Sequence, residues 1–259
     1  MPFITAADPD LDFTALALKE LAARGCHLCE LGIPYSDPIA DGPVIQASYT
    51  RALAQKVRLA DILATVGAVT PQLGMPIVTM VSYSIVYRHG IEQYVRDAKQ
   101  AGVSGAIVPD LLLEEADTLA DVCRREDFSL IQLVTPTTPR DRAVRIAERS
   151  SGFLYYVSVT GITGERTRLP DNLVQNVAWL RERTELPICI GFGISRPEHV
   201  RLLAPVADGL IVGSALVRRM EYAASRPRAE VLREMGELAD ELLSALRETP
   251  DVQPPKSGK

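Results

Sequence analysis

The stretch IEQYVRDAKQAGVSGAIVP, residues 91–109, contains one complete helix–strand unit of this chain. Its first part predicts an amphipathic helix over Ile91–Ala101, and Gly102 stands where a glycine commonly ends a helix. The run Gly105–Pro109 that follows is aliphatic and bounded by Gly and Pro, as buried parallel strands are. The stretch therefore predicts a helix that leads back into a buried strand, which indicates an α/β fold.

The same alternation runs from one end of the chain to the other. Short apolar runs predict further strands over Phe3–Ala6, Cys26–Gly32, Pro76–Ser82, Ser129–Val134, Phe153–Ser158, Pro187–Gly191 and Asp208–Val212. Amphipathic patterns between them predict helices such as Asp10–Arg24, Leu113–Arg125, Arg140–Arg149, Asp171–Arg183 and Arg228–Leu246. About eight βα units in a chain of 259 residues predict a single (β/α)8 TIM barrel, with its active site at the carboxyl ends of the strands. An open doubly wound sheet is the alternative, although no G-x-G-x-x-G follows the first strand.

Composition narrows the class of protein. No linker-like break divides the chain, so we expect one domain over 1–248 and a disordered, proline-containing tail over 249–259. The net charge of −5 and the pI of about 5.4 disfavour nonspecific nucleic-acid binding. No apolar run approaches the ~20 residues of a membrane span, and no signal-peptide pattern is visible. With only four cysteines, these features predict a cytoplasmic protein.

Two common catalytic side chains are scarce. The chain has 28 basic residues, but the only lysines are Lys19, Lys56, Lys99, Lys256 and Lys259. None lies at the end of a predicted strand, which excludes a Schiff-base aldolase, and the three histidines are too scattered for a zinc site. Cys26 and Cys29 match C-x2-C, but on a strand they would diverge, so all four cysteines are expected to pack in the core. Carboxylates and a tyrosine remain to handle protons.

Glu30 is the first candidate for that role. It belongs to the segment Glu30-Leu-Gly-Ile-Pro-Tyr-Ser-Asp-Pro-Ile-Ala-Asp-Gly-Pro43, where strand alternation directs Glu30 into the barrel mouth and Leu31 toward the helices. Burial should raise the pKa of its carboxyl group, which suits a general acid or base near neutrality. The alternative is a structural carboxylate paired with an arginine. Asp41, in the same segment, is a second candidate or a turn-forming residue, whereas Asp37 is read as an Asx-turn residue.

Glycine turns near the end of the chain indicate a phosphate site. Gly191–Ser195 follows the seventh predicted strand, and Gly213–Val217 runs from the eighth strand into a helix. Backbone N–H groups of such turns and a helix N-terminus attract anions, and TIM barrels often bind phosphate at this position. The loop 161–168 after the sixth predicted strand is polar and bounded by glycines, so it is read either as a lid or as a solvated connection.

Five of these motifs, taken together, resemble one family. They are Phe3-Ile-Thr-Ala-Ala-Asp-Pro9, the Glu30–Pro43 segment continued to Gln46, Tyr155-Tyr-Val-Ser-Val-Thr-Gly-Ile-Thr-Gly164, Gly191-Phe-Gly-Ile-Ser195 and Val212-Gly-Ser-Ala215. In order and spacing they are similar to the tryptophan synthase α subunit family. The resemblance implies a lyase that cleaves indole-3-glycerol phosphate to indole and glyceraldehyde 3-phosphate. Protonation of indole C3 makes the substrate its own electron sink, which agrees with the lack of a suitable lysine or metal site.

The resemblance also implies roles for single residues. Glu30 would protonate indole C3, Asp41 would accept a hydrogen bond from the indole N–H, and Tyr155 would orient Glu30. The other implied substrate-binding residues, which hold the phosphate or wall the indole pocket, are Phe3, Gly164, Phe192, Gly193, Gly213 and Ser214.

The same resemblance implies a partner. The chain would need no metal and no cofactor itself and would join a β subunit, which carries pyridoxal phosphate, in an α2β2 complex. Three positions depart from the family pattern, namely Ser84, Leu112 and Val159, and the first two lie in loops that face the β subunit in the family. The altered loops motivate one alternative, a stand-alone lyase that supplies free indole to a specialised pathway. A second alternative, of a different class, is a non-catalytic subunit that only activates its partner.

Overall fold

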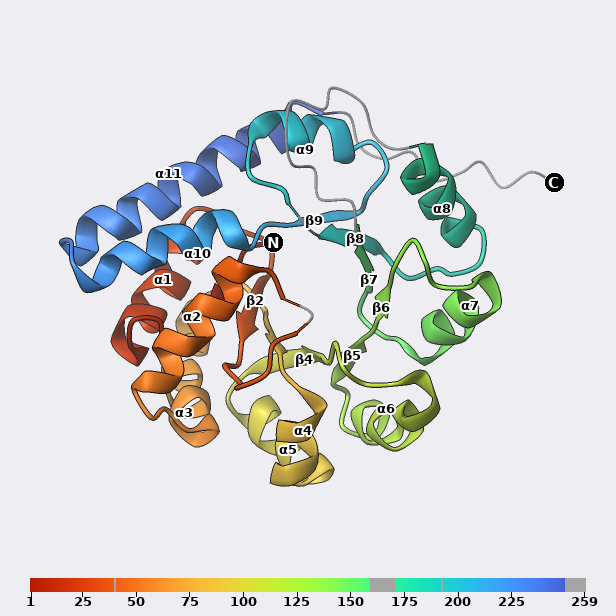
Figure 1. The fold of residues 1–259 in the computed structure, drawn as a ribbon, viewed down its shortest axis with the longest axis horizontal. Helices are drawn as coiled ribbons and strands as arrows, with labels where there is room; N and C mark the ends of the chain where they lie inside the picture. The colour runs from red at the N-terminus through yellow and green to blue at the C-terminus, as the bar shows by residue number, and fades with distance from the viewer. Residues whose placement is uncertain (40, 159–170, 192, 250–259) are drawn as a thin grey trace.

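The computed structural model describes residues 1–39, 41–158, 171–191 and 193–249. Within them, parallel strands form a barrel that is surrounded by helices (Figure 1). The strands are β1 (Phe3–Thr5), β2 (Cys29–Gly32), β3 (Ile77–Met80), β4 (Val103–Ile107), β5 (Ser129–Ile131), β6 (Leu133–Val134), β7 (Leu154–Val157), β8 (Ile188–Gly191) and β9 (Gly209–Ile211). The predicted α/β barrel is therefore confirmed.

The two ends of the sheet meet, which excludes the open doubly wound alternative. Strands β1 to β5 and β6 to β9 form two parallel sheets. The N–H of Phe3 donates to the carbonyl of Val212 at 2.9 Å, and the N–H of Val212 donates to the carbonyl of Met1 at 2.9 Å. The predicted fifth strand, Ser129–Val134, is divided at Gln132 into β5 and β6 and connects the two sheets on the other side.

One predicted strand begins later than its apolar run. β2 starts at Cys29, so the expectation that Cys26 lies in the strand is wrong. The reason is a Schellman turn after α1: the N–H of Cys26 donates to the carbonyl of Leu21 at 3.2 Å, and Gly25 has a φ of +81°. That hydrogen bond takes the N–H of Cys26 away from the sheet. Cys29, Cys123 and Cys189 are buried, Cys26 is half-buried, and all four are free thiols.

The helices follow the strands in the expected order. They are α1 (Leu11–Ala23), α2 (Pro43–Ala54), α3 (Leu59–Val69), α4 (Tyr83–His89), α5 (Ile91–Gln100), α6 (Ala116–Arg125), α7 (Arg140–Arg149), α8 (Asp171–Arg181), α9 (Pro197–Leu203), α10 (Ser214–Met220) and α11 (Arg228–Arg247), with 3₁₀ turns at Thr70–Gln72, Leu113–Glu115 and Glu221–Ala224. Gly102 follows α5 with a φ of +79°, as its predicted place at a helix end requires.

The core has two layers. The larger one lies between the strands and the surrounding helices and includes Leu31. The smaller one fills the barrel and consists of Val78, Ile107, Ile131, Phe153, Tyr155, Cys189 and Ile211. Leu28 packs against this inner layer, so the predicted alternation along β2 is correct and Glu30 shares the inward face.

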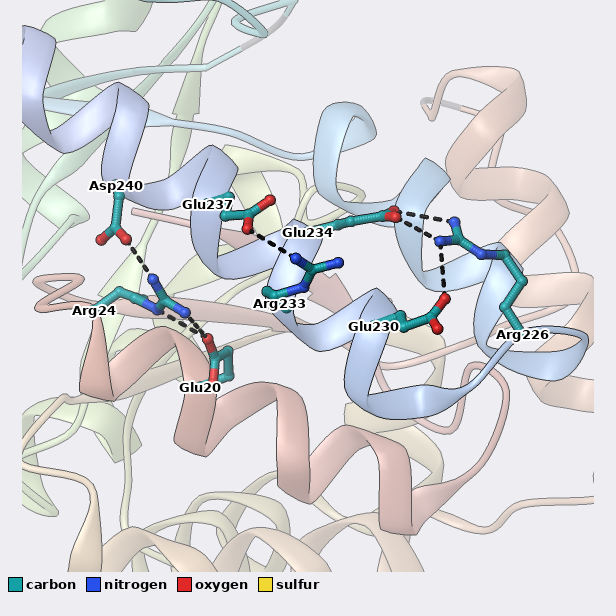
Figure 2. Close-up of polar contacts among 8 residues, drawn as sticks. All are labelled: Glu20, Arg24, Arg226, Glu230, Arg233, Glu234, Glu237 and Asp240. Atoms are coloured by element: carbon teal, nitrogen blue, oxygen red, sulfur yellow. Dashed lines mark hydrogen bonds and ion pairs between the residues drawn. The ribbon is translucent and has the colours of Figure 1, made fainter.

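Charged side chains fasten the last helix to the first. Arg24, directly after α1, forms ion pairs with Glu20 of α1 and with Asp240 of α11 (Figure 2). At the start of α11, Arg226, two residues before the helix, pairs with Glu230 and Glu234 of the helix (Figure 2). A Cβ atom on Gly236 would lie 2.3 Å from the Glu20 carboxylate, so the absence of a side chain there lets the two helices approach.

The far end of the chain is described only as far as residue 249. Thr249 lies just beyond α11, and its hydroxyl donates to the carbonyl of Ala245 in that helix at 2.9 Å. The remainder of the predicted tail, 250–259, lies outside the described residues. In the described part of the chain, no helix combines the length and the apolar character needed to cross a membrane.

Candidate active site

Glu30 occupies the position that its strand dictates. In the register of the sheet it lies level with Phe3 of β1 and Val78 of β3. Its side chain is fully buried, and neither carboxylate oxygen has a hydrogen-bond partner among the described residues. Burial raises the pKa of the carboxyl group to about 8, and the positive charge of the amino terminus opposes this only in part.

Within the described ranges, nothing supports the alternative that Glu30 is a structural carboxylate paired with an arginine. None of the ion pairs among the described residues includes it, and its oxygens accept nothing. A buried carboxyl group with a raised pKa and no partner is unusual in a core, where buried polar groups are normally satisfied. It is, however, what a proton donor near neutral pH requires.

Asp41 lies in the loop that joins β2 to α2. Burial raises the pKa of its carboxyl group to about 6, opposed by a hydrogen bond from the Tyr35 hydroxyl. The N–H of Asp41 donates to the carbonyl of Pro38 at 3.1 Å, and the side chain of Gln46 donates to the carbonyl of Asp41 at 2.8 Å. The backbone of Asp41 therefore makes the turn, and the turn does not use the Asp41 carboxylate.

Asp37, in the same loop, differs from its prediction. The N–H of Ile39 donates to the main-chain carbonyl of Asp37 at 2.8 Å, not to its side chain. The carboxylate instead accepts from the hydroxyl of Ser36 at 2.5 Å and is exposed. Asp37 is thus a loop residue, but the prediction that its side chain makes an Asx turn is wrong.

The ring of Phe3 connects the Glu30 side of the mouth to one of the predicted phosphate turns. A Cβ atom on Gly32 would lie 2.5 Å from Cζ of Phe3, and one on Gly213 would lie 3.7 Å from Cβ of Phe3. Gly213 is the residue before α10, and Ser214 is the first residue of that helix. Gly193 is exposed in the turn after β8 and has a φ of +81°, which an L side chain rarely adopts.

Three predicted positions cannot be placed. Gly164 and Phe192 lie outside the described residues, as do Val159 and the whole loop 161–168. Their assignments stay predictions.

Tyr155 lies beside Glu30 but does not bind it. It extends inward from β7, and the negative charge of Glu30 adds to the burial that raises the pKa of its phenol well above the ordinary 10. A Cβ atom on Gly191 would lie 2.3 Å from the hydroxyl of Tyr155, so the tyrosine packs over that glycine. Because both Glu30 oxygens lack a hydrogen bond from any described residue, the proposed orienting contact is not made in this structure.

The sequence pattern does not single out two aromatic residues that lie near the carboxylates of Glu30 and Asp41. One is Tyr35, whose hydroxyl donates a hydrogen bond to the Asp41 carboxylate. The other is Tyr49, whose phenol pKa is raised by burial and, further, by the charges of Asp41, Tyr35 and Glu30. Tyr49 stands four residues after Ile45 on α2, a spacing typical of a core stripe, so pattern alone could not mark it. Its adjacency to the Glu30–Pro43 segment was the one available signal.

The rim of the mouth exposes large apolar side chains. Ile39, Tyr87 and Leu112 are 93%, 71% and 56% exposed, and they come from the loops or helices that follow β2, β3 and β4. Two of these loops are tied together, since the Asp110 carboxylate accepts from the hydroxyl of Ser82 at 2.6 Å and from the N–H of Tyr83 at 2.7 Å. In the described ranges, no three His, Cys, Asp or Glu side chains are grouped as a metal ion would need.

Comparisons with known proteins agree on one family. The family described as tryptophan synthase alpha chain matches residues 1–246. The alpha chain from Rhodopirellula baltica is 58% identical over 258 residues, covering 97% of this chain and 93% of that relative. The alpha chain from Rippkaea orientalis is 46% identical over 249 residues, covering 96% and 92%. A solved structure of the tryptophan synthase α2β2 complex from Pyrococcus furiosus matches with a TM-score of 0.86 and 35% identity, over 94% of this chain and 96% of that one.

Proposed function

Because the chain belongs to the tryptophan synthase alpha chain family, we propose that the mouth of its barrel is the active site and that Glu30 is its acid/base. The chain is a carbon–carbon lyase of tryptophan biosynthesis that cleaves indole-3-glycerol phosphate to indole and glyceraldehyde 3-phosphate. The observation that carries the assignment of Glu30 is its fully buried, unpartnered carboxyl group with a pKa of about 8.

With that pKa, Glu30 is mostly protonated at neutral pH and can act as an acid. It donates its proton to indole C3, which places a positive charge on the ring. The bond between C3 and the glycerol carbon then breaks, and its electron pair returns to the ring. The hydroxyl on that carbon loses its proton and becomes the carbonyl of glyceraldehyde 3-phosphate. The Glu30 carboxylate can take up this proton, so the residue is restored.

Asp41 acts in its ionised form, whereas Glu30 acts in its protonated form. With a pKa of about 6 it is mostly ionised at neutral pH. A carboxylate can accept a hydrogen bond from the indole N–H and stabilise the positive charge that develops there. The hydrogen bond from Tyr35 stabilises the ionised form.

The opposite end of the mouth receives the phosphate. Gly193, Gly213 and Ser214 offer backbone N–H groups and one hydroxyl, and we assign Gly164 to the same group from its motif. Phe3 forms one wall of the indole pocket, and we assign Phe192 to another.

The partner of the chain is the β subunit of tryptophan synthase, and pyridoxal phosphate belongs to that subunit. We assign the exposed rim side chains Ile39, Tyr87 and Leu112 to this contact, because covering apolar surface favours association. We also place the chain in the cytoplasm, since four free thiols suit a reducing compartment. Residues 1–248 are taken as one domain, because β1 to α11 share one closed barrel.

The test is a cleavage assay with indole-3-glycerol phosphate in which β subunit is titrated into the purified chain. We expect indole release by the chain alone, a higher rate with β subunit, and a stable complex. Glu30→Gln should lower kcat by about a thousandfold or more, as loss of a general acid does. No binding and no stimulation by β subunit would support the stand-alone lyase instead. A Glu30→Gln chain with a normal rate would refute the assignment of Glu30.

A further inference from the structure

The buried hydroxyl of Tyr49 has no function in the mechanism described above. Among the described residues, only three buried side-chain polar atoms lack a hydrogen-bond partner, namely both oxygens of Glu30 and the hydroxyl of Tyr49. Tyr49 is 1% exposed. Buried tyrosine hydroxyls usually find a partner, because an unpaired one is destabilising. That the three unsatisfied atoms belong to two residues of the same site indicates that Tyr49 serves a ligand.

The hydroxyl of Tyr49 faces the same strand that carries Glu30. A Cβ atom on Gly32 would lie 2.8 Å from the Tyr49 hydroxyl and 2.5 Å from Cζ of Phe3. Gly32 comes two residues after Glu30 and therefore shares its face of β2, one step closer to the mouth. The hydroxyl of Tyr49 and the tip of the Phe3 ring thus meet above a glycine, next to the acid/base.

The neighbours of Tyr49 make it a hydrogen-bond donor. Its ring centroid lies 5.5 Å from that of Tyr35, whose own hydroxyl is engaged by Asp41. Burial, followed by the charges of Asp41, Tyr35 and Glu30, raises the pKa of the Tyr49 phenol well above 10. The phenol therefore stays neutral at any pH at which the enzyme works and keeps its proton to donate.

Residues before and after Tyr49 along α2 fasten this helix to the segment that starts with β1. The hydroxyl of Ser48, one residue before Tyr49, lies 2.6 Å from the hydroxyl of Thr5 on β1. Arg51, two residues after Tyr49, donates to both carboxylate oxygens of the buried Asp8, at 2.9 and 2.8 Å. These contacts fix the part of α2 that carries Tyr49, so the buried ring is presented from a fixed backbone, as is expected of a group that is arranged before its ligand arrives.

We propose that Tyr49 is a substrate-binding residue whose hydroxyl donates a hydrogen bond to a hydroxyl oxygen of the glycerol chain of indole-3-glycerol phosphate. This inference rests on the proposed function. The Phe3 ring runs from Gly213, at the phosphate end, to Gly32, beside Glu30. The Tyr49 hydroxyl lies at the Gly32 end of that ring, and the glycerol chain must cross this interval to join the phosphate to the indole. A glycerol hydroxyl that accepts from Tyr49 is left with its own proton free to pass to Glu30.

The test is Tyr49→Phe in the complex with β subunit, because the substitution removes only the hydroxyl. We expect kcat/KM for indole-3-glycerol phosphate to fall about ten- to hundredfold, the loss of one buried hydrogen bond. The Tm should stay the same or rise, because an unsatisfied buried hydroxyl has been removed. Tyr94→Phe is the matched control: Tyr94 is also buried, but its hydroxyl lies 2.7 Å from that of Thr79. That variant should lose Tm and keep kcat/KM.

A second probe locates the contact without turnover. Indole-3-propanol phosphate keeps the ring and the phosphate but lacks both glycerol hydroxyls. Its Kd, measured by calorimetry, should be the same for the wild type and Tyr49→Phe. A Kd weakened as much as kcat/KM would overturn the glycerol assignment, and so would an unchanged kcat/KM for Tyr49→Phe in an active enzyme. A wild-type complex that fails to cleave the substrate would instead overturn the proposed function, and this assignment with it.

Discussion

Arg51 and Asp8 form a two-point contact between α2 and the turn that follows β1. Nε and Nη2 of Arg51 donate to the two carboxylate oxygens at 2.9 and 2.8 Å, and the Asp8 carboxylate is completely buried. Two parallel hydrogen bonds fix both the distance and the plane of the pair. Since α2 follows the Asp41 loop directly, this contact sets where the loop ends.

Arg51→Met should therefore destabilise the fold strongly. The buried carboxylate of Asp8 would lose its cation, and breaking such a pair costs about 3 kcal/mol or more. Urea unfolding should show a lower free energy of unfolding for this variant. Arg58→Met is the control, because Arg58 and Asp61 are 78% and 36% exposed and such pairs contribute less than about 1 kcal/mol. Equal effects of the two substitutions would contradict the role of the Arg51 pair.

The rate of cleavage should depend on pH with two limbs. Glu30 must be protonated, so kcat/KM should fall as the pH rises through about 8, and Asp41 must be ionised, so kcat/KM should fall as the pH drops through about 6. The profile is then a bell with its maximum between these values. Asp41→Asn should lower the rate and remove the acidic limb while leaving the alkaline one. An acidic limb that persists in this variant would assign it to another group.

The stability of the fold should also depend on the charge of Glu30. The pKa of its carboxyl group rises from 4.5 to about 8 on folding, so the folded state binds the proton more tightly than the unfolded state. The contribution of this tighter proton binding to the free energy of unfolding is fully present below pH 4.5 and is lost as the pH rises toward 8. Relative to Glu30→Gln, the wild type should lose up to about 1.4 kcal/mol per pH unit in this window. Urea unfolding of both proteins at several pH values measures the difference, and a gap that does not change with pH would show that burial leaves the pKa of Glu30 unaltered.

Gly191→Ala should damage the site through Tyr155. The added methyl group would lie 2.3 Å from the Tyr155 hydroxyl and 2.7 Å from two ring carbons, so the ring must move away from its place beside Glu30. We expect kcat/KM to fall about tenfold or more, with a lower Tm from the strained packing. Gly42→Ala is the control, because no atom lies within 4 Å of its added methyl group and its φ of −71° suits alanine. Normal activity of Gly191→Ala would show that the position of Tyr155 has no effect on the reaction.

Much of this molecule follows from short-range pattern. The alternation along β2 directs Glu30 inward and Leu31 outward, so the sequence alone predicts the inward position of Glu30 and the direction of its pKa shift. Cys26 is different, because a hydrogen bond to Leu21 ends helix α1 and takes the first residues of an apolar run out of the strand. Tyr49 is different again. Its spacing from Ile45 is that of a core residue, and only the packing of α2 on β1 brings its hydroxyl to Gly32.

The packing of α2 also determines which changes of length the chain can tolerate. Ser48, Tyr49 and Arg51 contact Thr5, Gly32 and Asp8 from a helix that turns by about 100° per residue, so the three side chains spread over about half of its circumference. A residue added to the loop before Asp41 would leave these three contacts of the helix in place, although it would displace Asp41 itself. A residue added inside α2, between Pro43 and Ser48, would rotate all three side chains away from their partners at once. The rotational position of α2 about its own axis is therefore fixed by three separate contacts, independently of the loop before it.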